Sequence, residues 1–297
     1  MRVLLLHNPG AGDREIDADG LTSLVADAGH AVTYRSLDDE TWRRALRVQH
    51  DLVAVAGGDG AVRKAVLAML DVGDTAPFSI LSVGTANNVA RTLGMLDDAR
   101  GIVASWEGAA AARPFDAGVV EHGDGPRAFI ESFGGGTFAE LVASGHEVEE
   151  GQTLLGNEID RALLKLRDLL DDASPAHWEV ELDGTDASGE YVGVEAMNIR
   201  SIGPNVALAP DADPGDGWLD VALIGREACV ELRTHVEQRL HGGSGDPPAV
   251  PVRRARRVVL KPPGDVRLHV DSAPVDRGGA PRLACRVIAG AAHAVGG

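Results

Sequence analysis

The sequence predicts an α/β N-terminal domain with a parallel sheet over residues 1–113, followed by a mainly β, sandwich-type domain over residues 114–297. In the first third, short apolar runs alternate with segments whose apolar residues follow the helical period, which is typical of a parallel sheet covered by helices. From about residue 114, short strands alternate with glycine-rich turns. The length of 297 residues fits two domains. This assignment leaves the last residues free to pack back on the first domain.

Four apolar runs in the first domain are the expected parallel strands, over residues 3–6, 31–34, 52–56 and 78–83. Residues 21–28 place apolar side chains at i, i+3, i+4 and i+7, so we expect a helix there that ends at Gly29. Residues 62–70 repeat this spacing. A helix carrying Trp42, with Asp39 as its cap, and helical turns over 87–93 and 102–106 complete the domain.

The second domain is expected to hold one long helix, over 159–170, and a series of strands. The strands are recognised by short runs of β-branched and aromatic residues between turn-forming residues. They are expected over residues 115–120, 128–133, 178–182, 191–199, 218–224, 257–260, 266–270 and 283–288.

Composition narrows the classes of protein and of site. The 45 acidic and 28 basic side chains leave a formal charge of −17, which argues against binding nucleic acid. No apolar run approaches the roughly 18 residues of a membrane span, and the amino terminus does not read as a signal peptide, so we expect a soluble, cytoplasmic protein. Cys229 and Cys285 lack metal-ligand spacing and are expected to be buried or half-buried thiols rather than zinc ligands.

Three glycine-containing loops follow the first, third and fourth expected strands, over residues 8–12, 57–60 and 84–87. The carboxyl ends of parallel strands share one edge of the sheet, where ligands of open α/β sheets bind. Glycine allows the backbone to approach a phosphate closely, and the amides of a following helix face the anion. The three loops together therefore predict a polyphosphate ligand.

Two polar residues in these loops have two interpretations each. Asp59 lies between glycines, and its carboxylate would repel a phosphate cluster unless a cation such as Mg²⁺ intervenes. It is also well placed to cap the helix that starts at Gly60. Thr85 suits a hydroxyl donor to a phosphate or a cap for the helix at Asn87. Both alternatives remain open at this point.

Several motifs resemble the diacylglycerol kinase catalytic family, which includes bacterial lipid kinases and sphingosine kinases. The resemblance rests on Asn8-Pro9-Gly10-Ala11-Gly12, Gly57-Gly58-Asp59-Gly60, Gly84-Thr85-Ala86-Asn87 and, in the second domain, Asp216-Gly217-Trp218-Leu219-Asp220. It covers nearly the whole chain. The combination of the second and third motifs is specific, whereas Gly-Gly-Asp-Gly alone is shared with NAD kinases and phosphofructokinase relatives.

The resemblance implies a kinase that holds ATP and Mg²⁺ between its domains and transfers the γ-phosphate to a hydroxyl of a lipid such as diacylglycerol, or of a small alcohol. Its implied nucleotide contacts are Asn8, Gly10, Gly12, Ser36, Gly57, Gly58, Asp59, Gly60, Gly84, Thr85 and Asn87. It also implies roles for six residues as catalytic groups and metal ligands. Asp59 and Asp116 would form a water-linked carboxylate pair around a catalytic Mg²⁺, Asp271 would serve the acceptor, and a structural Mg²⁺ would be held by Asp213, Asp216 and the Trp218 carbonyl.

The acceptor motif departs from the family pattern, because the family's Asp-Gly-Glu appears here as Asp271-Ser272-Ala273. A methyl group cannot accept a hydroxyl proton. Two alternatives therefore stand beside the lipid kinase: a nucleotide-binding regulatory protein with impaired catalysis, and a soluble NAD kinase-like enzyme. Without the resemblance, the loop containing Asp213 and Asp216 would be interpreted as an acidic turn.

A dense basic cluster over residues 253–261 contains Arg253, Arg254, Arg256, Arg257 and Lys261. Such a cluster suits peripheral contact with anionic lipid headgroups, but an exposed strand with solvated arginines is the favoured interpretation. The acceptor and the oligomeric state, including a homodimer, are left open by the sequence.

Overall fold

A computed structural model describes residues 1–11, 17–106, 112–121, 125–146, 158–243, 246–276 and 280–296. Gly12, a predicted nucleotide contact, lies outside these ranges. The chain forms two compact units, one of Met1–Asp116 with Ala289–Gly297 and one of Ala117–Ile288. The expected domain boundary after residue 113 lies just before the division at Asp116, and the C-terminal segment belongs to the first unit.

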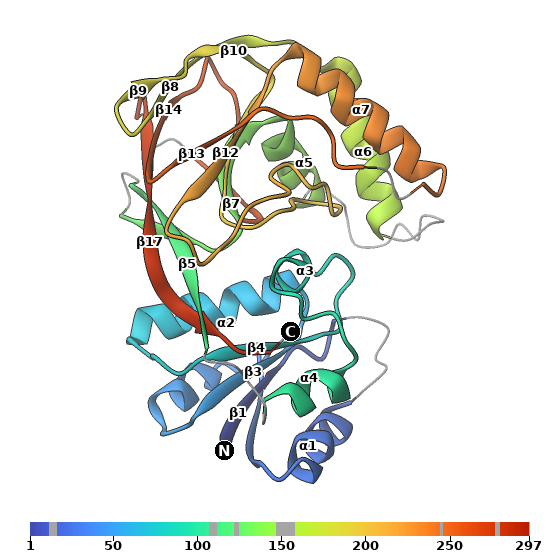
Figure 1. Ribbon diagram of the computed structural model, residues 1–297, viewed down its shortest axis with the longest axis vertical. Helices are drawn as coiled ribbons and strands as arrows, with labels where there is room; N and C mark the ends of the chain where they lie inside the picture. The colour runs from blue at the N-terminus through green and yellow to red at the C-terminus, as the bar shows by residue number, and fades with distance from the viewer. Residues whose placement is uncertain are drawn as a thin grey trace. The chain divides into compact units, whose positions relative to one another are not determined.

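The first unit is built on a parallel sheet, as the predicted fold class requires (Figure 1). Its strands are β1 (Arg2–His7), β2 (Ala31–Ser36), β3 (Leu52–Gly57) and β4 (Phe78–Ser82), in the order β4-β3-β1-β2. The end of β17 (Leu283–Ala294) joins β4 as a further parallel neighbour, through Ala294 and Phe78. Every residue of β3 is buried, because helices cover both faces of a parallel sheet.

The helices of this unit are α1 (Ala18–Asp27), α2 (Asp59–Val72), α3 (Asn88–Leu93) and α4 (Ala99–Ser105), with a 3₁₀ helix η1 (Trp42–Arg47). Helix α1 contacts α4 on one face of the sheet, and α2 lies on the other face (Figure 1). Helix α2 also contacts η1. The helix predicted around Trp42 is a short 3₁₀ helix, and Asp39 does not cap it. Asp39 accepts hydrogen bonds from the backbone and hydroxyl of Thr41, and the short segment that follows buries Trp42 within a single 3₁₀ element.

The second unit is a β-sandwich with a helical layer, which confirms the predicted mainly β class. One antiparallel sheet runs β13 (Val252–Ala255), β12 (Leu219–Ile224), β11 (Gly193–Met197), β7 (Ser132–Gly136), β15 (Leu268–Val270) and β16 (Ala273–Val275). The facing strands are β5 (Arg113–Glu121), β6 (Arg127–Phe129), β8 (Ala176–Leu182), β9 (Thr185–Asp186), β10 (Gly189–Tyr191), β14 (Arg257–Lys261) and β17. Between the sheets lies a core that includes Phe133, Trp178 and Leu260.

Two expected strands are interrupted in the structure. The run 128–133 divides into β6 and β7, and the run 191–199 divides at Val192 into β10 and β11. At this break the Val192 N–H donates to the Ile224 carbonyl and its own carbonyl accepts from the Thr137 N–H, so the strand changes partners there. A continuous apolar run does not reveal such a change of partner.

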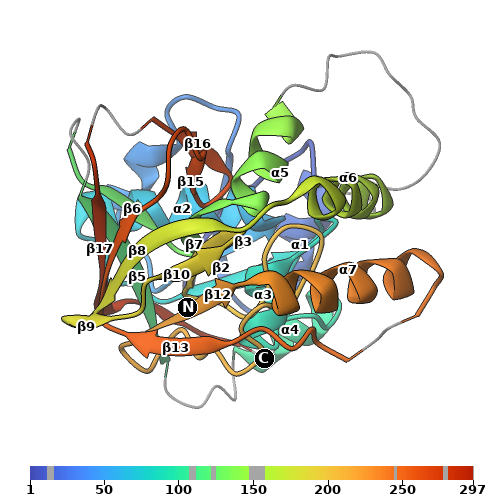
Figure 2. The same ribbon diagram turned by 90° about the horizontal axis from the view of Figure 1, so that it is seen from above.

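Three helices cover the outer face of the six-stranded sheet: α5 (Thr137–His146), α6 (Glu158–Asp172) and α7 (Arg226–Leu240) (Figure 2). The sequence predicted only α6. Helix α7 buries Ala228, Leu232 and Val236 at i, i+4 and i+8, but polar and charged residues fill most other positions and obscure this stripe. In the described ranges, no helix combines the length and apolar composition that a membrane span needs.

Candidate nucleotide and acceptor site

The loops that follow β1, β3 and β4 lie against one another at the carboxyl edge of the parallel sheet. A Cβ on Gly84 would lie 2.4 Å from the Cα of Gly58, a distance that no side chain allows. A Cβ on Gly57 would lie 3.4 Å from the Cβ of Asn8 and 2.4 Å from the Cβ of Ala61. The three glycine-containing loops therefore meet, as expected from parallel strands that end at one edge.

Asp59 joins two of these loops. It is the first residue of α2, but its carboxylate accepts the backbone N–H groups of Asn88 and Val89, both at 2.9 Å. Asp59 thus caps α3, not the helix that starts beside it. Burial raises the pKa of Asp59, and the two amide hydrogen bonds offset part of that rise. A half-buried carboxylate therefore fixes the start of α3 beside the start of α2.

The loop before α3 leaves one buried acceptor unused. Asn87 has a left-handed backbone, with φ of 52°, and its side-chain amide donates to the Gly84 carbonyl at 2.7 Å. The Oδ1 of Asn87 is buried and has no hydrogen-bond partner among the described residues. Thr85 is exposed in the same loop. Left-handed backbone at a non-glycine residue is costly and is concentrated at functional sites.

The loop after β1 and the end of β2 carry the other predicted nucleotide contacts. Asn8 donates its N–H to the Ala56 carbonyl at 2.9 Å, and its Oδ1 accepts from the Gly10 N–H at 3.3 Å. Ser36 is the register neighbour of His7, and its hydroxyl accepts from the Asp38 N–H at 3.2 Å. These residues lie at the same edge of the sheet as the glycine loops.

Asp116, the predicted partner of Asp59 at a catalytic metal, is completely buried in β5. Its carboxylate accepts the N–H of Gly290 at 2.6 Å. Gly290 lies within β17 and has a left-handed backbone, with a φ of 59°. Asp116 thus fastens the returning C-terminal strand to β5, whatever further role it has.

Asp271 is held by backbone amides in the second unit. Its carboxylate accepts from the N–H groups of Glu131 at 2.9 Å, Ser132 at 3.2 Å and Ile130 at 3.3 Å, and its own φ is 51°. The carboxylate is therefore fixed in one orientation at the turn between β15 and β16. Ala273, at the position of the family's glutamate, is exposed on β16.

A buried ion pair beside Asp271 escaped the sequence analysis. His269 Nε2 lies 2.8 Å from the Glu195 carboxylate, and neither side chain has any exposed surface. His269 Nδ1 lies 2.7 Å from the Asp271 carbonyl, and since a carbonyl only accepts, this nitrogen carries a proton. The available signal was a charged or titratable residue inside an apolar strand, in Val194-Glu195-Ala196 and Leu268-His269-Val270.

Opposing influences set the protonation of this pair. Burial raises the pKa of Glu195, and the nearby His269 offsets only part of the rise. Burial alone would lower the pKa of His269, but the charge and hydrogen bond of Glu195 outweigh it, so that the pKa of His269 is raised. The pair therefore retains a proton that a free imidazole would release.

The predicted ligands of the structural Mg²⁺ have protein partners. Asp213 accepts the Gly215 N–H at 3.0 Å, and one oxygen of Asp216 accepts the Trp218 N–H at 3.0 Å. The other oxygen of Asp216 is paired with Arg254. Within the described ranges, no group of three His, Cys, Asp or Glu side chains is arranged to hold a metal ion.

Most of the basic cluster is also paired. Besides Arg254, Arg257 lies 3.4 Å from Glu181 and Lys261 lies 2.5 Å from Glu179. These contacts agree with the interpretation of the cluster as a solvated, acid-paired strand face. The cysteines are free thiols, as expected: Cys285 is buried, which raises its pKa to about 12, and Cys229 is half-buried.

Comparison with known proteins covers both units. Residues 2–120 match the diacylglycerol kinase catalytic domain, and residues 146–291 match the YegS C-terminal NAD kinase beta sandwich-like domain. A diacylglycerol kinase of Bacillus subtilis is 27% identical over 279 residues, which covers 91% of this chain and 89% of the relative. A probable lipid kinase YegS-like protein of Pseudomonas aeruginosa is 27% identical over 227 residues, which covers 75% of this chain and 71% of that protein.

The fold is shared with solved structures. A crystal structure of a diacylglycerol kinase from Bacillus anthracis superposes with a TM-score of 0.67 at 16% identity, over 100% of this chain and 97% of that one. The two domain matches follow the order of the two units described above, and the glycine loops lie within the first match. Both units of the chain are therefore similar to diacylglycerol kinases and YegS-like lipid kinases, the family that the sequence motifs resemble.

Proposed function

We propose that this chain is an ATP-dependent kinase that transfers the γ-phosphate of ATP to a hydroxyl group of a lipid such as diacylglycerol. The meeting of three glycine-containing loops at the carboxyl edge of the parallel sheet carries the proposal, because a polyphosphate uses all three. The names of the relatives support a lipid acceptor.

The nucleotide half of the site has the features that phosphoryl transfer needs. The contact between Gly58 and Gly84 keeps side chains out of the space between the loops, so backbone amides can approach phosphate oxygens. Bound Mg²⁺ would neutralise charge on the phosphates, and it usually takes only one or two carboxylates besides phosphate oxygens. Asp59 suits that role, with Asp116 as its proposed partner. Asn8, Ser36 and Thr85 are the proposed polar contacts to the nucleotide.

The acceptor half relies on Asp271 alone. A loose transition state for phosphoryl transfer demands positioning more than a strong base, so a single fixed carboxylate is sufficient in principle. Three backbone amides and the left-handed backbone hold Asp271 in one orientation. We assign it the role of orienting the acceptor hydroxyl.

The direct test is transfer of label from γ-labelled ATP to a panel of acceptors by the purified full chain. Diacylglycerol, a sphingoid base, glycerol and NAD should be presented in parallel, with lipids in mixed micelles. Label is expected in a lipid acceptor and not in NAD. Transfer to NAD alone would establish the NAD kinase-like alternative, and transfer to none would contradict the kinase proposal.

Variants of Asp59 separate its charge from its capping bonds. Asp59→Ala removes both acceptors and should displace the loop before α3, so that ATP binding and transfer both fall. Asp59→Asn retains one oxygen acceptor but not the charge. If Asp59 serves Mg²⁺, this variant should bind ATP yet lose about 10²–10³-fold in transfer rate.

The matched control is Asp98→Asn, since Asp98 caps α4 by accepting the Gly101 N–H at 2.7 Å away from the glycine loops. That variant should keep full transfer activity. Full activity in Asp59→Asn would show that Asp59 acts only as a cap.

A second candidate function is a nucleotide-binding regulatory protein with impaired catalysis. Ala273 favours it, because the family's glutamate is missing, and so do the amide hydrogen bonds that already occupy Asp271. This candidate predicts ATP binding by calorimetry without turnover, and a gain of transfer in Ala273→Glu. Robust transfer by the unmodified chain would exclude it.

A further inference from the structure

The acidic loop before β12 lies beside an arginine on the edge strand β13. In the strand register Asp220 on β12 is opposite Arg254 on β13. The guanidinium of Arg254 reaches from there to the carboxylate of Asp216, which precedes β12 in the loop. The pairing of β12 with β13 therefore also places the guanidinium of Arg254 beside the acidic loop.

Trp218 holds the arginine in place. Arg254 lies on β13, and Arg256 lies at the bend between β13 and β14 (Arg257–Lys261). Their guanidinium groups lie 5.3 Å and 4.4 Å from the centre of the Trp218 ring. Contacts of this kind are attractive because the ring face is negative. The Asp216 side chain is 29% exposed and that of Arg254 is 49% exposed, so water does not fully screen the pair.

Both carboxylate oxygens of Asp216 and one of Asp213 already have protein partners. One Asp216 oxygen accepts the Trp218 N–H and the other contacts Arg254, while Asp213 closes a turn on the Gly215 N–H. Mg²⁺ demands near-octahedral oxygen ligands and sheds its waters reluctantly. A guanidinium already paired with the central carboxylate both neutralises that ligand and repels a second cation.

We infer that Arg254 takes the place of the structural divalent cation in this chain, so that the second unit folds and remains stable without a metal at the loop of Asp213 and Asp216. The inference concerns the β-sandwich unit and does not depend on which acceptor is phosphorylated. It also gives the basic cluster a structural role, distinct from contact with lipid headgroups.

Nucleotide-free protein tests this inference with two readouts that need no activity. Thermal unfolding is followed with EDTA and with millimolar Mg²⁺ or Ca²⁺, and Tb³⁺ emission sensitised by Trp218 reports a lanthanide in the loop. For the unmodified chain, the Tm should be the same with and without cation, and Trp218→Phe should not change Tb³⁺ emission. Arg254→Gln should lower the Tm in EDTA only slightly, by about 1–2 °C, because the ion pair is partly exposed. This variant should recover its Tm with Ca²⁺ or Mg²⁺ and should gain Trp218-dependent Tb³⁺ emission.

Three control variants separate charge from fold. Arg254→Lys keeps the charge and should behave as the unmodified chain. Arg256→Gln removes the other arginine that lies over the Trp218 ring but leaves the pair of Arg254 with Asp216 intact. Its Tm and Tb³⁺ emission should therefore not respond to added cation. The double variant Arg254→Gln with Asp216→Asn should lose the response that Arg254→Gln gains.

Two results would overturn the inference. One is Trp218-dependent Tb³⁺ emission or cation stabilisation in the unmodified chain that Asp213→Asn and Asp216→Asn remove, since the loop would then bind metal beside Arg254. The other is an Arg254→Gln variant indistinguishable from the unmodified chain in both readouts. If Arg254→Gln does not fold, the titrations of the unmodified chain and of Arg254→Lys decide alone.

Discussion

Gly134 allows two buried titratable side chains to meet across a β-strand. It lies on β7, opposite Glu195 on β11 and opposite His269 on β15. A Cβ at this position would lie 2.1 Å from the Glu195 carboxylate. Because glycine leaves that space open, the side chains of Glu195 and His269 contact each other directly. The other ring nitrogen of His269 donates a hydrogen bond to the carbonyl of Asp271. A glycine in a central strand thus supports the turn that presents the acceptor carboxylate.

The Glu195–His269 pair should make stability depend on pH in a specific direction. The pKa of His269 is raised in the folded chain, so the pair's contribution is fully present below the unfolded value of about 6.5 and is lost as pH rises through the folded value. In Glu195→Gln, His269 is buried without a counter-charge and no longer retains that proton. The gap in the free energy of unfolding between the unmodified chain and this variant should therefore narrow above about pH 6.5.

Denaturant unfolding at a series of pH values measures this gap. The control is Glu190→Gln, because Glu190 and His177 form an exposed pair at 3.4 Å, with side chains 65% and 63% exposed. Its stability should follow that of the unmodified chain throughout. A gap that widens with rising pH would show that the buried pair does not retain a proton.

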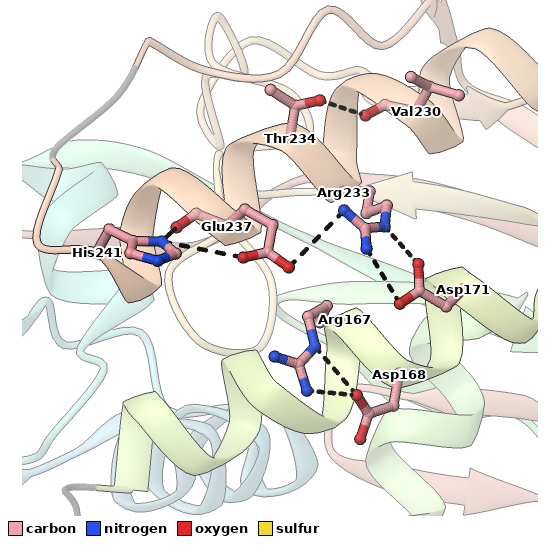
Figure 3. A network of polar contacts seen from close by, with 8 residues as sticks. All are labelled: Arg167, Asp168, Asp171, Val230, Arg233, Thr234, Glu237 and His241. Carbon is pink, nitrogen blue, oxygen red and sulfur yellow. Dashed lines mark hydrogen bonds and ion pairs between the residues drawn. The ribbon is translucent and has the colours of Figure 1, made fainter.

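At the scale of elements, helices α6 and α7 are joined by two kinds of contact. Their outer edges carry a polar network in which Arg233 of α7 bridges Asp171 of α6 and Glu237 of its own helix, with Arg167 and Asp168 alongside (Figure 3). Their inner faces bury Leu163, Leu166, Leu170, Leu232 and Val236 in one apolar cluster. Exposed ion pairs stabilise little, whereas buried leucines stabilise substantially.

The two kinds of contact should therefore respond very differently to truncation. Leu166 is completely buried, and Leu166→Ala should lower the free energy of unfolding by about 2–5 kcal/mol. Arg233→Ala removes a side chain that is 45% exposed, and its effect should be small and should vanish in high salt. Denaturant unfolding of both variants at low and high salt measures the difference. A larger loss in Arg233→Ala would show that the network in Figure 3 holds the helices together.

At the scale of the whole molecule, the chain ends in the unit where it began. β17 starts in the second unit and finishes beside β4 of the first, where the Val295 N–H donates to the Phe78 carbonyl at 2.8 Å. The Gly290 N–H satisfies the buried Asp116 carboxylate, and the Gly296 carbonyl accepts from Arg113 at 3.3 Å. The last residues thus complete a sheet formed mainly by the first residues.

Removal of residues 289–297 should consequently destabilise the first unit. It exposes the edge of β4 and leaves Asp116 buried without the Gly290 donor, which costs about 1–3 kcal/mol or more for a charged group. Hydrogen exchange should speed up in β3 and β4 but not in α7. A shorter truncation after Val295 keeps the donors of Gly290 and Val295 and should leave exchange in β4 near that of the full chain. Equal exchange in all three chains would contradict a structural role for the segment.

The sequence was sufficient to predict those features of the fold that depend on residues close together in the chain. The buried strand over Leu52–Gly57 and the amphipathic helix that ends before Gly29 were readable because period and turn chemistry operate within a few positions. The meeting of the glycine loops followed as well, because parallel strands must end at a common edge. The site motifs and the family resemblance came from the same local runs.

The sequence by itself therefore determined the fold class, the family resemblance and the set of loops that meet. Only the tertiary structure decided that Asp59 caps α3, that Glu195 and His269 meet across Gly134, that Arg254 reaches Asp216, and that the C-terminal strand returns to the first sheet. These contacts join residues far apart in the chain, and they depend on strand register and packing. No local pattern encodes register between distant strands, because a side chain's neighbours across a sheet are chosen by the whole arrangement of strands.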